Sequence, residues 1–188
     1  MKNTVRLRPV EDRDIEFLYT RNNQNFMGAW QGFRYISLSS YKRRFSDGGF
    51  NNDKMQVLVI ENCKRRVGFM VADFPSQHVV NIGISLDEDA RGCGVCKMAL
   101  SQVVGYFFEN YLIERIEADT DADNKPALAV LEAAGFVREG TLRHRRFHHG
   151  VFHDSVYFSL LREDWHDKNA CVDGNWRAKV VKVVKGGR

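Results

Sequence analysis

The sequence predicts an α/β (α+β) protein of one domain, with a mixed, mostly antiparallel twisted sheet flanked by helices. Segments with strand character alternate with segments of helical periodicity, and several neighbouring strands are joined by hairpin connections. The chain has 188 residues, 44% of them hydrophobic, which suffices for one core and nearly excludes a second catalytic domain. We expect the domain over residues 1–165 and a basic C-terminal tail or extra strand over 166–188.

The N-terminal part predicts an edge strand followed by helices. Thr4–Val10 alternates between apolar and polar residues, and Pro9 near its end is typical of an edge strand. A helical stretch follows from about Glu11 to Asn23, with Asp12 as a candidate cap. A short helix is expected around Ser40–Phe45.

Three strands and a long helix are predicted in the middle of the chain. Gln56–Glu61 and Arg66–Phe74 are rich in Val, Ile and Phe, and their short connection indicates a hairpin. Val80–Leu86 alternates apolar residues with small polar ones, so one face of this strand lies toward the core. From about Gly92 to Asn110, apolar residues recur at steps of three and four, which indicates a helix.

The last part predicts a strand, a short helix and a hairpin. Arg115–Thr120 is a short strand, and Asn124–Ala134 is a helix that Gly135 ends in a left-handed conformation. Phe136–Phe147 and Val151–Leu161 are the two arms of the hairpin.

Charge and composition exclude several classes of protein. From Lys168 onward six basic residues and one acidic residue give +5, which leaves −1 for residues 1–167 and argues against nucleic-acid binding by the body. No apolar run approaches the roughly 20 residues that span a bilayer, and no signal peptide is apparent. We therefore expect a cytoplasmic protein with no membrane partner, whose four cysteines are reduced.

One segment has the features of a phosphate-binding loop. Between Ile82 and Cys96 a strand, an acidic turn, an Arg-Gly-x-Gly loop and a helix start follow one another. Backbone N–H groups and the positive end of a helix attract phosphate at such a place. The segment is neither a Walker loop nor a dinucleotide fingerprint, and a plain glycine-rich turn is the alternative interpretation.

This loop resembles the pyrophosphate loop of the GNAT superfamily of N-acetyltransferases, Arg/Gln-x-x-Gly-x-Gly/Ala. Arg91 and Gly94 match it, and Cys96 departs from it at the last small position. Asn124–Phe136 is similar to the Asn-x-x-Ala/Ser…Glu-x-x-Gly-Phe helix of the same family. With the segments at 138–140, 150–154 and 160–165, the chain is most similar to the branch that includes the ribosomal-protein alanine N-acetyltransferases.

The resemblance implies the acyl-CoA N-acyltransferase fold, with acetyl-CoA as the cosubstrate. The cosubstrate would lie between the strands at Val80–Leu86 and Arg115–Thr120, which separate in such proteins. Asn124 would contact its pantetheine arm, although a plain helix cap is the alternative for this side chain. The residues expected to bind acetyl-CoA are Ile84, Ser85, Leu86, Arg91, Gly92, Cys93, Gly94, Val95, Cys96, Lys97, Asn124, Ala127 and Leu131.

The implied reaction is the attack of a primary amine on a thioester, directly within a ternary complex. Asp119 is the first candidate for the base, because some relatives carry a glutamate there; a structural role or a water chain is the alternative. Asn81 could only hold a water molecule. The usual acid, a tyrosine, is replaced by Leu131, but a thiol with a pKa of about 8.5 leaves as thiolate at a cost of only about 2 kcal/mol at pH 7.

The acceptor side is the least defined part of the sequence. Trp30, Phe33 and Tyr35 are expected to form a wall for the acceptor, which is either a small-molecule amine or a protein N-terminus. An aromatic wall with few acids does not favour a polycation. A homodimer is possible, and the alternative function is a non-catalytic acyl-CoA-binding or scaffold module.

Two patterns suggest metal or redox chemistry, and we expect no metal from either. Cys93 and Cys96 form a C-x-x-C pair without further ligands at a regular spacing, although the helix start could lower a thiol pKa there. The histidines of the final hairpin are expected to diverge and to form a cationic surface at low pH. Arg146 or His148 at the acceptor site or on the adenosine phosphate is the alternative interpretation.

Overall fold

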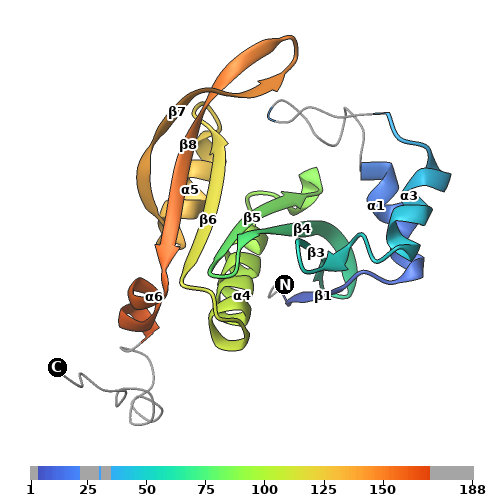
Figure 1. Cartoon of the computed structure of the whole chain (residues 1–188), viewed down its shortest axis with the longest axis horizontal. Coiled ribbons are helices and arrows are strands. Elements are labelled where there is room, and N and C mark those ends of the chain that lie inside the picture. Colours follow the sequence, from blue (N-terminus) through green and yellow to red (C-terminus); the bar gives the residue numbers. More distant parts are fainter. Residues whose placement is uncertain (1–3, 22–29, 31–34, 170–188) are drawn as a thin grey trace.

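An eight-stranded sheet organises the residues that the structure describes, which are 4–21, 30 and 35–169 (Figure 1). The structure is a computed structural model. The strand order is β1-β3-β4-β5-β6-β8-β7, with β2 paired to β3, and neighbours are antiparallel except β5 and β6, so the predicted fold class is confirmed. The strands are β1 (Val5–Pro9), β2 (Asn51–Asn52), β3 (Met55–Asn62), β4 (Arg65–Ser76), β5 (Val79–Leu86), β6 (Arg115–Asp121), β7 (Val137–His148) and β8 (Val151–Leu161).

Both faces of the sheet are covered at β3, which explains its continuous apolar run. Val57 and Val59 pack with the side of the molecule that carries α1 (Ile15–Arg21) and α3 (Leu38–Ser46). Leu58 and Ile60 belong to the main core on the opposite face. Successive side chains of a strand point to opposite faces, so a strand covered on both sides needs apolar residues at every position.

The main core is built around α4 (Val95–Asn110), which crosses one face of the sheet (Figure 1). Its buried side chains recur at steps of three and four residues, as the sequence predicts. They are Val95, Ala99, Leu100, Val103, Val104, Phe107 and Phe108. This helix begins three residues later than predicted, because Gly92 and Gly94 have positive φ angles that a right-handed helix does not contain.

The predicted helix at 11–23 is divided into a 3₁₀ turn, η1 (Asp12–Asp14), and the α-helix α1. The expectation that Asp12 caps it is wrong, because Glu11 occupies the N-cap position. The side chain that satisfies the helix start is Asp14, whose Oδ2 accepts a hydrogen bond from the Glu11 N–H at 2.9 Å.

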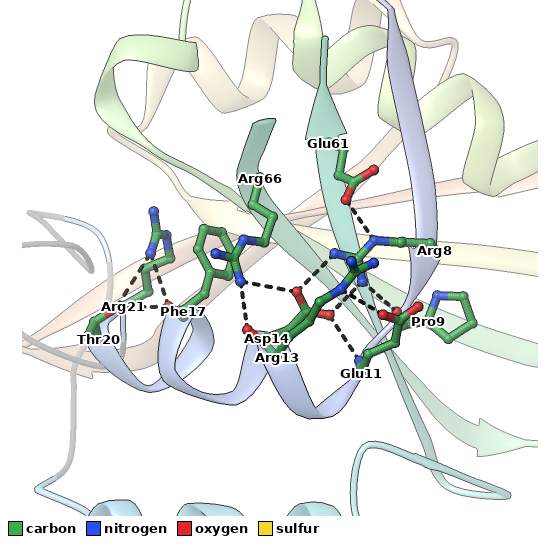
Figure 2. Close-up of polar contacts among 10 residues, drawn as sticks. All are labelled: Arg8, Pro9, Glu11, Arg13, Asp14, Phe17, Thr20, Arg21, Glu61 and Arg66. Carbon is green, nitrogen blue, oxygen red and sulfur yellow. Dashed lines mark hydrogen bonds and ion pairs between the residues drawn. The ribbon is translucent and has the colours of Figure 1, made fainter. Parts of the chain in front are cut away.

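Asp14 is also the centre of a buried ion network that joins η1 to the sheet (Figure 2). Arg8 on β1 donates to both of its carboxylate oxygens, at 2.5 and 2.9 Å, and to Glu61 on β3 at 2.7 Å. Arg66 on β4 approaches the same carboxylate at 3.3 Å. Burial alone would raise the pKa of Asp14, but the bonds from Arg8 and from the Glu11 backbone lower it below its usual value.

The C-terminal part places a helix and a long hairpin beside β6. α5 (Lys125–Ala133) is followed by Gly135 with φ +91°, so the predicted left-handed helix end is confirmed. The hairpin of β7 and β8 extends beyond the other strands (Figure 1). α6 (Arg162–Asn169) runs across the expected boundary at 165/166, so no break in secondary structure marks that boundary. Residues 170–188 and Phe33 lie outside the described residues.

The helices of the described part of the chain are all too short or too polar to cross a bilayer.

Candidate active site

A cavity opens where β5 and β6 part. The two strands pair in parallel over three residue pairs, from Val79 and Arg115 to Asn81 and Glu117. Beyond that point a cavity of about 490 Å³ lies between them, lined also by residues of α4, α5 and β7. The expected site residues that line it are Trp30, Ile84, Ser85, Leu86, Arg91, Gly92, Cys96, Asp119, Asn124, Ala127 and Leu131.

Other expected residues lie outside this lining. Val95 is fully buried in the core, so it can serve the site only through its backbone. Cys93, Gly94 and Lys97 are exposed around the start of α4. Asn81 lies in the paired part of β5. The side chain of Tyr35 is 95% exposed, and the structure does not bring it to the cavity.

The lining also contains residues that the expected set omitted. Most are neighbours on the same elements, and the alternation of β5 and β6 could have indicated them. Arg146 is different, because it comes from β7 and was considered only as an alternative. These residues are Ile82, Gly83, Leu100, Ala118, Thr120, Pro126, Val130 and Arg146.

The loop before α4 has the geometry of an anion site. Gly92 and Gly94 adopt φ of +72° and +84°, which favours glycine, and Gly94 is the N-cap of α4. The first hydrogen bond within the helix runs from the Met98 N–H to the Gly94 carbonyl, at 3.1 Å. The N–H groups of residues 95–97 therefore have no acceptor within the helix. Such groups, with the positive end of a 16-residue helix, suit a phosphate.

The two loop cysteines do not form a reactive pair. Burial raises the pKa of the Cys96 thiol to about 11, so the expectation that the helix start lowers a thiol pKa is wrong for this residue. The exposed Cys93 thiol donates to the Ala90 carbonyl at 3.1 Å.

Asn124 has the structural role that was its alternative interpretation. Its Oδ1 accepts from the Ala127 N–H at 3.4 Å and its Nδ2 donates to Thr120 Oγ1 at 3.0 Å, so it caps α5 and ties the helix to β6. It lines the cavity as well. A contact with the cosubstrate is therefore compatible with the cap.

Asp119 faces the cavity from β6 and is held by two donors. Ser155 Oγ donates to Oδ2 at 2.7 Å, and Arg146 Nε donates to the same oxygen at 3.1 Å. Both bonds use Oδ2, so within the described residues Oδ1 is the oxygen left for a proton donor. The carboxylate is about one-sixth exposed, at 17%.

Comparison with known proteins identifies the family. Residues 4–137 match the acetyltransferase (GNAT) domain. The chain belongs to the GNAT acetyltransferase family. It is 25% identical to the putative ribosomal N-acetyltransferase YdaF of Bacillus subtilis, over 86% of this chain and 93% of that relative.

Solved structures of GNAT proteins share its fold. The spermidine N-acetyltransferase of Vibrio cholerae, in complex with CoA and spermine, superposes with a TM-score of 0.78 at 21% identity, covering 86% of this chain and 97% of the other. RimJ of Mycobacterium smegmatis, in complex with CoA-disulfide, gives a TM-score of 0.75 at 24% identity, covering 85% and 83%. This GNAT chain is thus an acetyl-CoA-dependent N-acetyltransferase, as the resemblance predicts.

Open space in this GNAT protein runs along β5 to the loop before α4. A Cβ added at Gly83, Gly92 or Gly94 meets no protein atom within 4 Å, so open space lies over the backbone at all three positions. Gly83 lies on β5 and the other two in the loop, so this space follows the strand to the start of α4. The buried Leu131 offers no proton at the cavity, and the general acid stays unassigned.

Beside Asp119, a second acidic residue of β6 is enclosed by hydrogen bonds. Tyr157 donates to Glu117 Oε2 at 2.5 Å and Arg115 donates to Oε1 at 2.6 Å. Burial and the bond to Glu117 raise the pKa of Tyr157 to about 12. Both Glu117 oxygens are engaged, so Asp119 is the better candidate for accepting a proton.

Two of the hairpin's histidines, His148 and His153, converge, contrary to the expectation that the histidines diverge. In β7 the residues 143–145 lie opposite Asp154 alone, because Leu142 pairs with Ser155 and Arg146 with His153. After this bulge, the rings of His148 and His153 stack with centroids 3.9 Å apart. A bulge re-aims the side chains that follow it, and no periodicity in the sequence indicates one.

Proposed function

We propose that the protein transfers an acetyl group from acetyl-CoA to a primary amine, of a small molecule or a protein N-terminus, by direct attack in a ternary complex. One observation carries the proposal: a single cavity connects the N-terminus of α4 with the carboxylate of Asp119. Its one end suits a pyrophosphate, and its other end holds a group that can accept a proton.

The residues of the chain have distinct parts in this reaction. The loop at Arg91–Gly94 and the first turn of α4 bind the phosphates, and the open edge of β5 positions the pantetheine arm. Asp119 takes the proton from the amine, directly or through a water molecule. The neutral amine nitrogen then bonds to the thioester carbon, the carbon–sulfur bond breaks to release the thiolate, and the second proton on the nitrogen passes to water, which leaves the amide.

The charges around the cavity favour an acceptor that is not a polycation. The described lining carries one carboxylate, Asp119, and two guanidinium groups, Arg91 and Arg146. Arg146 lies directly beside the candidate base, where a second positive charge on the acceptor would be repelled. A single amine with a neutral or acidic group nearby suits the cavity, and the α-amine of a peptide or an amino acid meets this description.

The pKa of the acceptor leads to the same preference. An α-amine with a pKa of about 7.8 costs about 1 kcal/mol to deprotonate at pH 7, whereas a lysine-like amine costs about 4–5 kcal/mol. A carboxylate such as that of Asp119, which is mostly buried and already held by a serine and an arginine, is a modest base. Such a site suits the amine that is easier to deprotonate.

The decisive experiment combines calorimetry with a matched pair of variants. Gly83→Val adds a side chain to open space on β5, and Gly140→Val does the same on β7 away from the cavity. We expect the first to weaken acetyl-CoA binding at least tenfold and the second to leave it unchanged, with both proteins folded. Equal binding in the two variants would show that the cosubstrate does not lie along β5.

An amine panel then tests the acceptor. Thiol release from acetyl-CoA would be followed with alanine-initiated peptides, free amino acids and spermidine. We expect turnover with α-amines to exceed that with spermidine. A preference for spermidine would overturn the argument from charge while leaving the cosubstrate site intact.

A further inference from the structure

A second cluster of chemically active side chains lies next to the cavity but outside its lining. It consists of Asp121 at the end of β6, His148 at the end of β7 and His153 on β8, hereafter the Asp-His-His cluster. Each residue offers one ligand atom, and these atoms all lie within 4.8 Å of one another. The side chains of Asp121 and His148 are only 2% and 3% exposed, and His153 is half-buried.

The hydrogen bonding of this cluster is incomplete. His148 Nε2 lies 2.6 Å from Asp121 Oδ2. Among the described residues four buried side-chain nitrogen or oxygen atoms have no hydrogen-bond partner, and three of them are Asp121 Oδ1, His148 Nδ1 and His153 Nε2. A buried polar atom without a partner costs roughly 1–3 kcal/mol, so three in one place indicate a missing ligand.

Neighbouring groups do not supply it. Arg146 Nε approaches Asp121 Oδ1 to 3.8 Å, beyond hydrogen-bond distance, because its guanidinium is bonded to Asp119. The ring of His149 contacts that of His148 edge-on, with centroids 5.2 Å apart. Asp154 is turned toward the His144 N–H, which it binds at 2.9 Å.

We propose that Asp121, His148 and His153 bind a divalent transition-metal ion, with Zn²⁺ as the best fit, once the nearly parallel, stacked rings of His148 and His153 turn so that one nitrogen of each points at the same ion. Two imidazoles and one carboxylate match the ligands that Zn²⁺ takes in proteins, with water at the fourth position. Mg²⁺ and Ca²⁺ prefer oxygen ligands throughout and are not expected to bind. The three ligands come from three strands, so the ion joins the end of β6 to the hairpin.

We assign the ion no part in the acetyl transfer; because its three ligands come from three strands, its expected effect is to stabilise the hairpin. The ion would fix the hairpin two residues from Arg146, which in turn holds Asp119. Metal binding should therefore raise the thermal stability of the protein and order the hairpin. The proposal does not depend on the identity of the acceptor.

The test is metal binding by the full-length protein, freed of metal with a chelator that is then removed. Titration with ZnCl₂ and elemental analysis should give one ion per chain. His153→Ala and Asp121→Asn should each weaken Zn²⁺ binding at least about tenfold and remove the rise in Tm. His144→Gln and His149→Gln, on the same hairpin but outside the cluster, are the matched controls and should bind like the wild type.

Co²⁺ provides a readout that does not depend on any variant. Cobalt bound by the cluster should show d–d absorption bands without thiolate-to-cobalt charge transfer. A charge-transfer band that disappears in Cys93→Ser would assign the metal to the cysteines and overturn the proposal. So would the absence of binding at millimolar Zn²⁺, or binding that survives His153→Ala.

Discussion

The guanidinium of Arg146 reaches across β8 and donates hydrogen bonds to both the carboxylate and the backbone carbonyl of Asp119. Nε donates to Oδ2 at 3.1 Å, and Nη2 donates to the backbone carbonyl at 2.7 Å. Arg146 lies on β7 and Asp119 on β6, and these strands are not neighbours in the sheet. Ser155, on β8 between them, also donates to Asp119 Oδ2. The hairpin therefore positions the candidate base.

Replacement of the candidate base should impair the chemical step more than binding. We expect Asp119→Asn to lower kcat about 10²-fold or more with little change in KM for acetyl-CoA. The loss in kcat should be larger with a lysine-like acceptor than with an α-amine, because deprotonating the lysine-like amine at pH 7 costs more free energy. Asp123→Asn, an exposed carboxylate just after β6, serves as the control. Unchanged kcat in Asp119→Asn would assign proton removal to water.

Arg146 should act through Asp119 rather than independently. Arg146→Gln is expected to lower kcat about tenfold, and Arg146→Lys to recover part of the loss. In a double-mutant cycle, Arg146→Gln should have little further effect when Asp119→Asn is already present. Additive losses in kcat would mean that the arginine contributes to the reaction by another route.

The buried network around Asp14 predicts a large effect on stability. Asp14→Asn leaves Arg8 buried without its main partner, so the free energy of unfolding should fall by about 3 kcal/mol or more. Arg13→Gln breaks the exposed ion pair with Glu11 and should change the free energy of unfolding by less than about 1 kcal/mol. Urea denaturation of both variants measures the difference. Similar losses of unfolding free energy in Asp14→Asn and Arg13→Gln would contradict the conclusion that the ion network around Asp14 is buried.

The lowered pKa of Asp14 makes this contribution depend on pH. The native carboxylate keeps its charge to lower pH than the unfolded one, whose pKa is about 3.9. The stabilisation is thus complete above about pH 5 and is lost as the pH falls below about 4, where the unfolded chain binds the proton first. The difference between wild type and Asp14→Asn in urea denaturation should be constant from pH 7 to 5 and shrink below pH 4.

The cysteines should differ in reactivity. With a pKa of about 11 and a half-buried position, Cys96 should be alkylated by iodoacetamide far more slowly at pH 8 than the exposed Cys63. Peptide mass spectrometry after timed alkylation separates the two. Acetyl-CoA should slow the modification of Cys96 further and leave that of Cys63 unchanged. Fast modification of Cys96 would show that the loop opens to solvent.

Sequence patterns located the regular elements within a few residues, because alternation and helical spacing report directly which faces are buried. The resemblance to the family, carried by the motifs of the loop and of α5, predicted most of the residues that line the cavity. The patterns failed at the β7 bulge at residues 143–145, where three residues lie opposite one; beyond it His148 lies beside His153 and Arg146 beside Asp119. Those contacts depend on long-range register, which the local sequence does not encode. Asp12 failed for a related reason, since Asp14 is fixed by partners on other strands.

The short pairing between β5 and β6 has a consequence for amide hydrogen exchange. From Ile82 to Leu86, β5 pairs with β4 on one side and borders the cavity on the other. Although β5 lies in the middle of the sheet, one side of its backbone is therefore unpaired with another strand over these residues. Without cosubstrate, the N–H groups directed to that side should exchange with deuterium faster than their position in the middle of a sheet would suggest. A bound thioester that takes the place of the absent neighbouring strand would slow them, so deuterium uptake along β5 reports the occupancy of the site amide by amide.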